Sequence, residues 1–501
     1  MIFRDWLKEL DYTLLQGSVD VETEDVIYDS RKAAPGKVFV AMKGIRVDGH
    51  SFIPQVLKAG VRVLVTERPV EEELKNSGLS EDELKQVTVV MVEEGRHALA
   101  LLSAARFDHP AKKLVMIGVT GTKGKTTTTH MIRAILLAAG KKVGMIGTTG
   151  TVIGDVVTPT LNTTPESYEL HQAFAQMVEA GCEYAVMEVS SQGIKMHRTD
   201  GLYFNYAIFT NISPDHIGPG EHADFEEYLY YKTILLNMCG IGLVNKDDEH
   251  APQIIKAANC ELYTYSEESK EADFVASDIR YVSQPDFVGT EFHISGKYDM
   301  EVRLGIPGLF NVVNALAAVS VCSFLGLDQA RISHALENIR VNGRMEIVYT
   351  SERCTVLVDY AHNAVSMESL LSTLRDYKPK RLVCVFGCGG NRSKDRRYSM
   401  GEIGGKMADL SIITADNSRY EKVEDIIADI RGSIEKTGGK FIEIPDRREA
   451  IRYSILHAQP GDMVAVIGKG HEDYQEINGV RHHFLDREVI EETVKELGEK
   501  A

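Results

Sequence analysis

Short apolar runs alternate with amphipathic segments along most of this chain. In the middle of the chain, the segments between the runs carry apolar residues at helical spacing, so the runs predict strands and the segments predict helices. The predicted strands lie at residues 114–119, 143–147, 184–189, 206–211 and 241–245. Such alternation is typical of a mostly parallel sheet with helices on both faces, whose ligands bind at the carboxyl ends of the strands.

The same pattern occurs before and after this central region. Shorter runs lie at 37–42, 61–66 and 87–92, and a second long series lies at 355–359, 381–386, 410–414, 441–444 and 463–467. We therefore predict three α/β domains: a small N-terminal domain (1–110), a central domain with a mostly parallel sheet (111–340) and a Rossmann-like C-terminal domain (341–501). Polar motifs follow the strand ends in both larger domains, so we expect their ligand edges to face each other across a cleft that closes on the substrates.

One stretch, residues 113–137, has the order strand, glycine-rich turn, helix. This order brings backbone N–H groups and a helix N-terminus to one point, where polyphosphate can bind. Lys125 is placed to reach the β- and γ-phosphates and Thr126 to hold Mg²⁺. Val119 stands where the strict phosphate-loop pattern requires Gly. A structural glycine turn is the alternative, but the strand and helix on either side favour a nucleotide site.

Composition narrows the class of protein. The net charge of −17 argues against a nucleic-acid partner, and no apolar run approaches the ~18 residues of a membrane span. The N-terminus has acidic residues where a signal peptide has an apolar stretch. The seven scattered cysteines are typical of reduced, buried thiols, and Cys384 with Cys388 is weak evidence for metal. We expect a cytoplasmic protein with small-molecule partners, no membrane insertion and a monomeric state.

Taken in order and spacing, the polar motifs resemble those of the Mur ligase family. Within that family they are most similar to the members that add the third residue of the peptidoglycan stem peptide, as GKGHEDYQ and DNSR indicate. The motifs are GVTGTKGKTT (118–127), NTTPE (162–166), MEVSS (187–191), FTNIS with DH (209–216), the helix with Lys232, PGLFNVVN (307–314), NGRMEIV (342–348), VDYAH (358–362), FGCGGNR (386–392), DNSR (416–419) and GKGHEDYQ (468–475).

The resemblance implies an ATP-dependent amide ligase. ATP would phosphorylate the D-Glu side-chain carboxylate of UDP-MurNAc-L-Ala-D-Glu, and the amine of meso-diaminopimelate would attack the acyl phosphate. Arg419 favours diaminopimelate, because lysine-adding relatives usually lack this arginine. An L-lysine-adding enzyme or a ligase for another amino acid or γ-glutamyl acceptor stays open. From another class, a non-catalytic nucleotide-binding regulatory protein is the alternative.

The resemblance also implies the site residues and the cofactors ATP and Mg²⁺. The catalytic set is Lys125, Glu188, His216, Lys232 and Arg344. The ATP contacts are Gly121, Thr122, Gly124, Lys125, Thr126, Thr127, Asn311, Arg344, Asp359 and His362. The contacts to the UDP-sugar dipeptide are Ser30, with Asp29 and Arg31 beside it, and Thr163, Thr164, Ser190 and Arg198. The amino-acid contacts are Arg392, Asp416, Asn417, Arg419, Gly468 and Glu472. The Mg²⁺ ligands are Thr126, Glu188, His216 and a carbamylated Lys232.

Two of these assignments compete with a plainer interpretation. Lys232, on a helix predicted over 226–236, is from the sequence alone an ordinary exposed lysine, whereas the resemblance makes it an anionic carbamate that binds Mg²⁺. Residues 29–31 are either a capped turn or a contact to an anionic ligand. The chain also departs from the family pattern at several positions, which leaves a divergent paralogue open: Lys123, Gln192, Pro214, Ala364 and Ser418.

Overall fold

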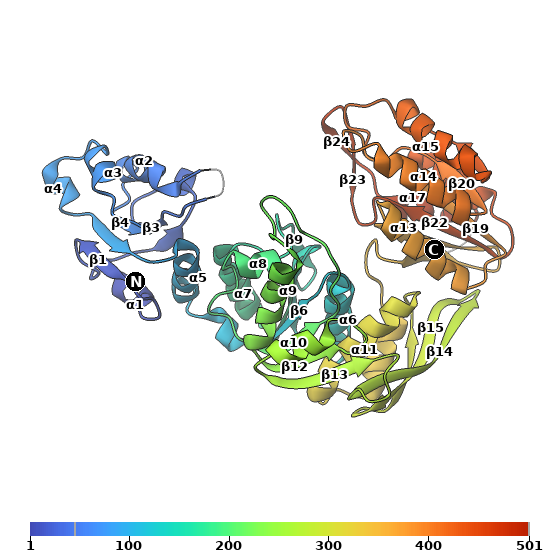
Figure 1. The fold of residues 1–501 in the computed structure, drawn as a ribbon, viewed down its shortest axis with the longest axis horizontal. Helices are drawn as coiled ribbons and strands as arrows, with labels where there is room; N and C mark the ends of the chain where they lie inside the picture. The colour runs from blue at the N-terminus through green and yellow to red at the C-terminus, as the bar shows by residue number, and fades with distance from the viewer. Residues whose placement is uncertain (45–46, 499–501) are drawn as a thin grey trace. The chain divides into compact units, whose positions relative to one another are not determined.

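The computed structural model of the chain describes residues 1–44 and 47–498 (Figure 1). It divides into two compact units, one of residues 1–273 and 317–326 and the other of residues 274–316 and 327–501. The limits of the three predicted domains stay predictions.

The N-terminal part of the first unit is a five-stranded sheet in the order β1-β5-β4-β3-β2, parallel except for β1. Its strands are β1 (Thr13–Gln16), β2 (Asp25–Ile27), β3 (Lys37–Val40), β4 (Val63–Thr66) and β5 (Thr88–Met91). Its helices are α1 (Phe3–Trp6), α2 (Ile53–Lys58), α3 (Glu71–Lys75), α4 (Glu81–Leu84) and α5 (Gly95–Arg106), with the 3₁₀ turns η1 (Ser30–Lys32), η2 (Gly49–Phe52) and η3 (Pro110–Lys113). Buried apolar side chains cover both faces of the sheet, as the α/β pattern predicts.

The central part of the first unit is built on parallel strands in the order β13-β12-β11-β6-β10-β7, followed by the antiparallel strands β8 and β9. The strands are β6 (Val115–Thr120), β7 (Val143–Gly147), β8 (Gly150–Ile153), β9 (Val156–Thr158), β10 (Tyr184–Glu188), β11 (Phe204–Phe209), β12 (Cys239–Asn245) and β13 (Glu261–Ser266). The helices are α6 (Lys125–Ala138), α7 (Ser167–Glu179), α8 (Ser191–Lys195), α9 (Phe225–Thr233) and α10 (Ala251–Ala257), with the 3₁₀ turn η4 (Ile234–Asn237).

The second unit begins with three antiparallel strands, β14 (Phe274–Gln284), β15 (Phe287–Gly296) and β16 (Met300–Leu304). Two helices follow, α11 (Leu309–Phe324) and α12 (Gln329–Glu337). The expectation that strands and helices alternate up to residue 340 is wrong for residues 274–304. The outer half of β14 alternates exposed and half-buried positions, and this one-sided pattern is typical of an antiparallel meander.

The rest of the second unit is a six-stranded sheet in the order β17-β18-β22-β19-β20-β21, in which only β17 is antiparallel. Its strands are β17 (Glu346–Thr350), β18 (Cys354–Asp359), β19 (Arg381–Phe386), β20 (Leu410–Ile413), β21 (Phe441–Glu443) and β22 (Asp462–Ile467), and β23 (Tyr474–Ile477) with β24 (Val480–His483) forms a separate hairpin. The helices are α13 (Ala364–Asp376), α14 (Asp395–Met407), α15 (Val423–Thr437), α16 (Arg447–Leu456) and α17 (Asp486–Glu496).

Predicted and observed element bounds agree closely where the apolar runs are continuous. The runs at 143–147 and 381–386 coincide with β7 and β19, and the other predicted strands differ by one or two residues at one or both ends. The helix predicted over 226–236 stops being α-helical at Thr233 and continues as the 3₁₀ turn η4. Lys232 therefore lies in the last turn of α9.

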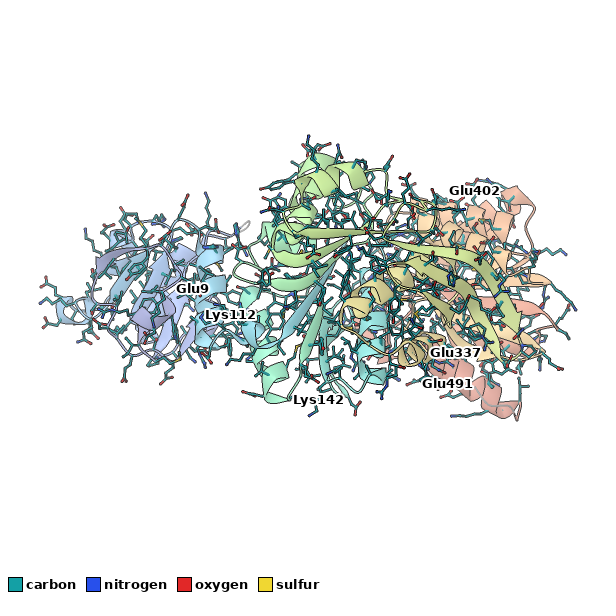
Figure 2. The ribbon with its side chains drawn as sticks, turned by 90° about the horizontal axis from the view of Figure 1, so that it is seen from below. Glu9, Lys112, Lys142, Glu337, Glu402 and Glu491 are labelled. Atoms are coloured by element: carbon teal, nitrogen blue, oxygen red, sulfur yellow. The ribbon has the colours of Figure 1, made fainter. Side chains whose placement is uncertain are left out.

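Three further features bear on the predictions from composition. All seven cysteines are free thiols, and Cys384 and Cys388 are buried. Lys112 donates to Glu9 at 2.9 Å and so links η3 to the segment between α1 and β1; Figure 2 labels both side chains. Within residues 1–44 and 47–498, no helix is both long and apolar enough to cross a membrane.

Candidate active site

The turn after β6 takes a shape that only glycine permits. Gly121 has φ +141°, and a Cβ there would lie 2.0 Å from Thr210 Oγ1, while Gly124 has φ +86° and caps α6. The N–H groups of Thr122 and Lys123 donate to the backbone and side-chain oxygens of Asn211, at 2.8 and 2.9 Å. The loop is therefore pinned to the end of β11, with the N-terminus of α6 behind it.

Two lysines converge on one carbonyl oxygen of this loop. Lys125 Nζ and Lys232 Nζ each donate to Gly121 O at 2.8 Å, although they come from different helices. Lys232 is only 2% exposed and also lies over the Tyr228 ring, with Nζ 4.6 Å from its centroid. Burial, with the Lys125 ammonium as a second cause, lowers the pKa of Lys232 well below its usual value. The interpretation of Lys232 as an ordinary exposed lysine is wrong.

Glu188 supplies a buried carboxylate next to the loop. Its side chain lies at the carboxyl end of β10, is 1% exposed, and accepts from Thr126 Oγ1 and from the Thr148 N–H, both at 2.9 Å. Gly147 is required opposite it, because a Cβ at that position would lie 2.3 Å from Glu188 Oε1. A hydroxyl and a carboxylate so close together are hard oxygen ligands of the type that Mg²⁺ prefers.

The predicted metal ligands are brought together only in part. Thr126 and Glu188 are in contact, and Lys232 reaches the same loop, but His216 is 59% exposed and its Nδ1 pairs with Glu221 Oε1 at 2.9 Å. The His216 ring centroid is 6.2 Å from that of Tyr228, whose hydroxyl bonds the Thr122 hydroxyl at 3.1 Å. His216 thus borders the loop through Tyr228.

The residues predicted to hold the UDP-sugar dipeptide form one network on the first unit. Arg198 donates to Thr164 O at 3.0 Å and pairs with Glu166 at 2.6 Å, while Thr164 Oγ1 bridges Glu188 O and the Ser190 N–H. Arg198 Nε is buried without a partner among the described residues, so it keeps a donor unused. The network links the predicted acceptor residues to the carboxylate of the nucleotide loop.

Two other predicted contacts of this set take different places. Thr163 Oγ1 bonds the Thr148 hydroxyl at 3.0 Å, next to Glu188. At residues 29–31 the structure has a capped turn: Asp29 accepts from the Arg31 N–H at 3.0 Å and pairs with the Arg31 guanidinium, and Ser30 opens η1. The capped turn is the plainer of the two interpretations offered for this tripeptide, and its contact to a ligand stays a prediction.

In the second unit, Asp359 and Arg344 lie around Tyr360. Asp359 accepts from the N–H groups of Met345 and Ala361, both at 2.8 Å, and burial raises its pKa against those two hydrogen bonds. The Arg344 guanidinium lies 5.1 Å from the Tyr360 ring centroid. His362 Nδ1 bonds Tyr360 O at 2.9 Å. Burial together with the ordered backbone fixes this group before any ligand binds.

Asn311, the remaining predicted ATP contact of the second unit, has a structural role. It is 1% exposed, its amide donates to Pro307 O at 2.7 Å, and it accepts from Asn314 at 3.2 Å. These bonds hold the start of α11. Its contact to a nucleotide stays a prediction.

The predicted amino-acid contacts gather at the carboxyl ends of β20 and β22. Asn417 Nδ2 donates to Glu472 Oε2 at 2.9 Å, and Gly468 has φ +113°, where a Cβ would lie 2.5 Å from Asp416 Oδ2. Arg419, itself at φ +51°, donates to Gly390 O at 2.6 Å. Anionic and cationic side chains are thus both present for a zwitterionic ligand.

Arg392 joins this cluster only at its edge. It is exposed, and its Cγ lies 3.9 Å from where a Cβ on Gly389 would stand, on the same glycine that Arg419 approaches. The two arginines therefore lie on either side of Gly389, where a side chain would stand 3.1 Å from Arg419 Nη1.

Sequence reasoning gave no role to Lys469, which lies at the centre of this cluster. Its side chain is fully buried, and Nζ donates to Asn417 Oδ1 and Glu472 Oε2, both at 3.3 Å, and to Tyr474 O. It is the lysine of the GKGHEDYQ motif, so the motif contained it, but a lysine between two glycines looks exposed. Thr148 and Tyr228 were missed as well, because their partners are distant in sequence.

Comparisons with known protein families match most of the chain. The family model described as "Mur ligase middle domain" matches residues 119–322, "Mur ligase, glutamate ligase domain" matches 343–470, and "Mur ligase family, catalytic domain" matches 23–107. The chain is 39% identical over 498 residues to a UDP-N-acetylmuramoyl-L-alanyl-D-glutamate–2,6-diaminopimelate ligase of Caldanaerobacter subterraneus, covering 98% of each chain. It is 36% identical to the protein of the same name in Clostridioides difficile, covering 99% of this chain and all of that one.

Solved structures give the same picture of the fold. A structure of a UDP-N-acetylmuramoyl-L-alanyl-D-glutamate–2,6-diaminopimelate ligase has a TM-score of 0.73 and 30% identity, covering 95% of this chain and 96% of that one. A folylpolyglutamate synthase of Mycobacterium tuberculosis, at 18% identity and a TM-score of 0.56, covers 74% of this chain and 92% of its own and shares the fold alone.

Proposed function

The chain belongs to the Mur ligase family, and on that premise we propose that it is an ATP-dependent ligase of peptidoglycan synthesis. It joins meso-diaminopimelate through an amide bond to the D-Glu side-chain carboxylate of UDP-MurNAc-L-Ala-D-Glu. The observation that carries the proposal is the near-full-length likeness to ligases of that name. The pinned glycine loop with its two lysines and buried glutamate agrees with ATP chemistry.

The loop would hold the nucleotide by backbone donors and one lysine. Lys125 Nζ lies on loop carbonyl oxygens at 2.8 and 3.1 Å, and it can leave them to meet the β- and γ-phosphates. The D-Glu carboxylate then attacks the γ-phosphorus and ADP leaves. The amine of diaminopimelate attacks the resulting acyl carbon, phosphate leaves, and the amine loses a proton. These steps need charge neutralisation and positioning rather than a nucleophilic side chain.

Mg²⁺ fits the residues beside the loop. Thr126 Oγ1, in the first turn of α6, and Glu188 Oε1, buried at the end of β10, would bind it, since they are paired and of the hard oxygen type. When bound, the ion neutralises phosphate charge. Until then Glu188 is held in place by the Thr148 N–H. His216 would become a further ligand if its exposed side chain turned from Glu221 toward the ion.

We extend the proposal to carbamylation of Lys232. Its amine is buried and shares Gly121 O with a second lysine, so two like charges compete for one acceptor. A neutral Lys232 amine can attack the carbon of CO₂; an N–C bond forms, a proton is released, and the product is an anionic carbamate. This change converts the uncharged amine into an anionic oxygen ligand for a second Mg²⁺.

For the amino acid, the second unit offers charges of both signs. Arg419 and Arg392 suit the distal carboxylate of diaminopimelate, and Glu472 suits its ammonium. Lysine lacks that carboxylate, so the arginines would discriminate against it. We place the enzyme in the cytoplasm, in keeping with its seven free thiols. We also propose that it is a monomer.

The decisive experiment measures phosphate release from ATP with UDP-MurNAc-L-Ala-D-Glu and, in separate reactions, meso-diaminopimelate, L-Lys or L-Orn. We expect release with diaminopimelate and little with the other two. Release with lysine but not diaminopimelate would overturn the specificity. Release with none of the three would favour a paralogous ligase or a non-catalytic nucleotide-binding protein.

A further inference from the structure

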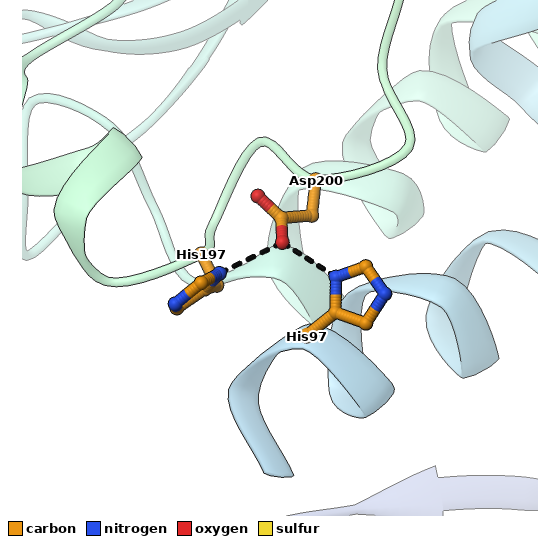
Figure 3. Close-up of side chains that lie close together, drawn as sticks. All are labelled: His97, His197 and Asp200. Atoms are coloured by element: carbon orange, nitrogen blue, oxygen red, sulfur yellow. Dashed lines mark hydrogen bonds and ion pairs between the residues drawn. The ribbon is translucent and has the colours of Figure 1, made fainter. Parts of the chain in front are cut away.

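Two histidines and an aspartate from separate parts of the first unit meet at one oxygen atom. His97 Nδ1 lies 2.6 Å and His197 Nδ1 lies 2.8 Å from the same Asp200 Oδ2, as Figure 3 shows. His97 lies on α5, beside the N-terminal sheet, whereas His197 and Asp200 lie in the turn after α8. Within residues 1–44 and 47–498, this is the one group of three side chains with metal-ligand atoms so close together, all within 4.8 Å.

The backbone positions these side chains before any ion binds. His197 has φ +56°, a left-handed conformation that is uncommon outside glycine. Hydrogen bonds hold it there, because the His197 N–H donates to Ile194 O and the next N–H, of Arg198, donates to Gly193 O, both at 2.9 Å. His97 is fixed by its helix, which has a buried face of eight residues. A site on such constrained elements loses little entropy when it binds a ligand.

The chemistry of the three side chains suits a transition metal better than Mg²⁺. Two imidazole nitrogens and one carboxylate oxygen are the ligand types of Zn²⁺ and related divalent ions, whereas Mg²⁺ selects oxygen. The side chains are 44%, 40% and 23% exposed for His97, His197 and Asp200, so an ion can enter and keep a water as its fourth ligand. Ligand atoms at tetrahedral Zn²⁺ stand about 3.3 Å apart, so the His97 and His197 contacts to Asp200 would open by about 0.7 and 0.5 Å.

We propose that His97, His197 and Asp200 form a binding site for a divalent transition-metal ion, with Zn²⁺ as the expected occupant. The ion would bind Nδ1 of each imidazole in place of its proton, which moves to Nε2 of the same ring or to solvent, and would fasten α5 to the turn that carries Arg198. That turn also holds the Thr164 and Glu166 contacts of the acceptor network. The site therefore connects the N-terminal sheet to the acceptor residues, and it stands whether or not the proposed reaction is correct.

The test is Zn²⁺ binding to the full chain, first freed of metal with a chelator and kept without nucleotide. Calorimetry should find one Zn²⁺ site that survives excess Mg²⁺. Co²⁺ at the same site should show the strong visible absorption of a tetrahedral complex. His97→Gln should weaken Zn²⁺ binding by at least about tenfold, since even the outer partners of metal ligands are worth that much. Amide exchange in α5 and in residues 197–200 should slow with Zn²⁺ in the wild type only.

Because the chain has 16 histidines, the experiment needs a matched control. His293 faces two carboxylates, Glu301 at 3.1 Å and Asp299 at 3.6 Å, but no second imidazole within the described part of the chain, so His293→Gln should bind Zn²⁺ like the wild type. Asp200→Asn tests the site again if His97→Gln folds poorly. Equal Zn²⁺ affinity in the wild type, His97→Gln and Asp200→Asn would overturn the proposal and leave a hydrogen-bonded cluster. Equal loss in His293→Gln would show adventitious binding to surface histidines and would overturn it too.

Discussion

Two buried lysines, one in each unit, differ in the hydrogen-bond acceptors that surround their amines. Lys469 Nζ donates to Asn417, Glu472 and the Tyr474 carbonyl, so its charge is matched on several sides. Among the described residues, Lys232 Nζ donates to one acceptor, Gly121 O, which also accepts from Lys125 Nζ. Burial alone therefore does not distinguish the two lysines. They differ in the acceptors around each amine, and burial with few acceptors disfavours the charged form.

The largest effect is expected from Lys232→Ala. If the amine becomes a carbamate that binds metal, its loss should lower kcat by about a thousandfold or more, comparable to removing a group that stabilises transition-state charge. Phosphate release measures kcat. Added bicarbonate should not rescue the variant, and mass spectrometry of the wild type in CO₂-saturated buffer should find the mass of one CO₂ on the Lys232 peptide. Lys142→Ala, an exposed lysine, is the control (Figure 2). Full activity of Lys232→Ala would end the carbamate proposal.

Lys469→Met tests the other side of the comparison. Removing the cation takes one donor from Asn417 and from the Tyr474 carbonyl and leaves the Glu472 carboxylate without its ion-pair partner. The free energy of unfolding should therefore fall by about 3 kcal/mol, as expected when one partner of a largely buried ion pair is removed. Urea unfolding of the full chain checks this value. Exposed Lys436→Met should leave stability unchanged. A Lys469→Met protein as stable as the wild type would mean that the acceptors do not define the role of this lysine.

Arg419→Ala asks whether the cluster around Lys469 recognises the amino acid. Loss of a charge-assisted hydrogen bond should raise the KM for meso-diaminopimelate about tenfold to a hundredfold and leave the KM for ATP unchanged. Steady-state kinetics with both substrates separates the two. Arg431→Ala removes a surface arginine of α15 and serves as the control. Equal rises in both KM values would indicate a general structural defect instead.

His171 extends the comparison to a buried base with no acceptor. Within residues 1–44 and 47–498 neither of its ring nitrogens has a hydrogen-bond partner, and burial lowers its pKa to about 3, with His109 as a lesser cause. Between pH 6.5 and pH 3 the unfolded chain therefore binds a proton that the folded chain does not. The free energy of unfolding consequently decreases as the pH is lowered through this window. At pH 5 the loss should be about 2 kcal/mol.

His171→Leu should remove that part of the pH dependence. Urea unfolding at pH 7 and pH 5 measures it, and exposed His482→Leu should keep the wild-type slope. The same loss of stability in His171→Leu would show that groups other than His171 carry the effect.

The comparison also shows how far sequence reasoning reaches. Strands such as β7 and β19 were predicted to the residue, because continuous apolar runs mark buried parallel strands. The antiparallel meander β14–β16 was missed, since its alternation of exposed and half-buried positions gives a weaker signal. Motif spacing placed the glycine loop and Glu188 at strand ends, where the structure has them.

What could not be predicted depends on contacts between distant residues. Lys232 and Gly121 are 111 residues apart in the chain, and no periodicity on α9 signals that its last turn closes over the loop. Lys469 was missed for the same reason, because Asn417 lies 52 residues before it. The roles of the site residues remain predictions until the variants are measured.

Strand β9 has a consequence for handling the protein. It is the outermost strand on its side of the sheet, and Val156 and Val157 on it are 67% and 57% exposed, with Leu161 beyond it wholly exposed. An uncovered apolar edge is a template on which a second chain can add a strand. At the high concentrations of crystallisation or storage, this edge is where we expect self-association to begin. Val157→Lys should reduce this self-association, because a charged side chain on the edge strand disfavours the addition of a second chain.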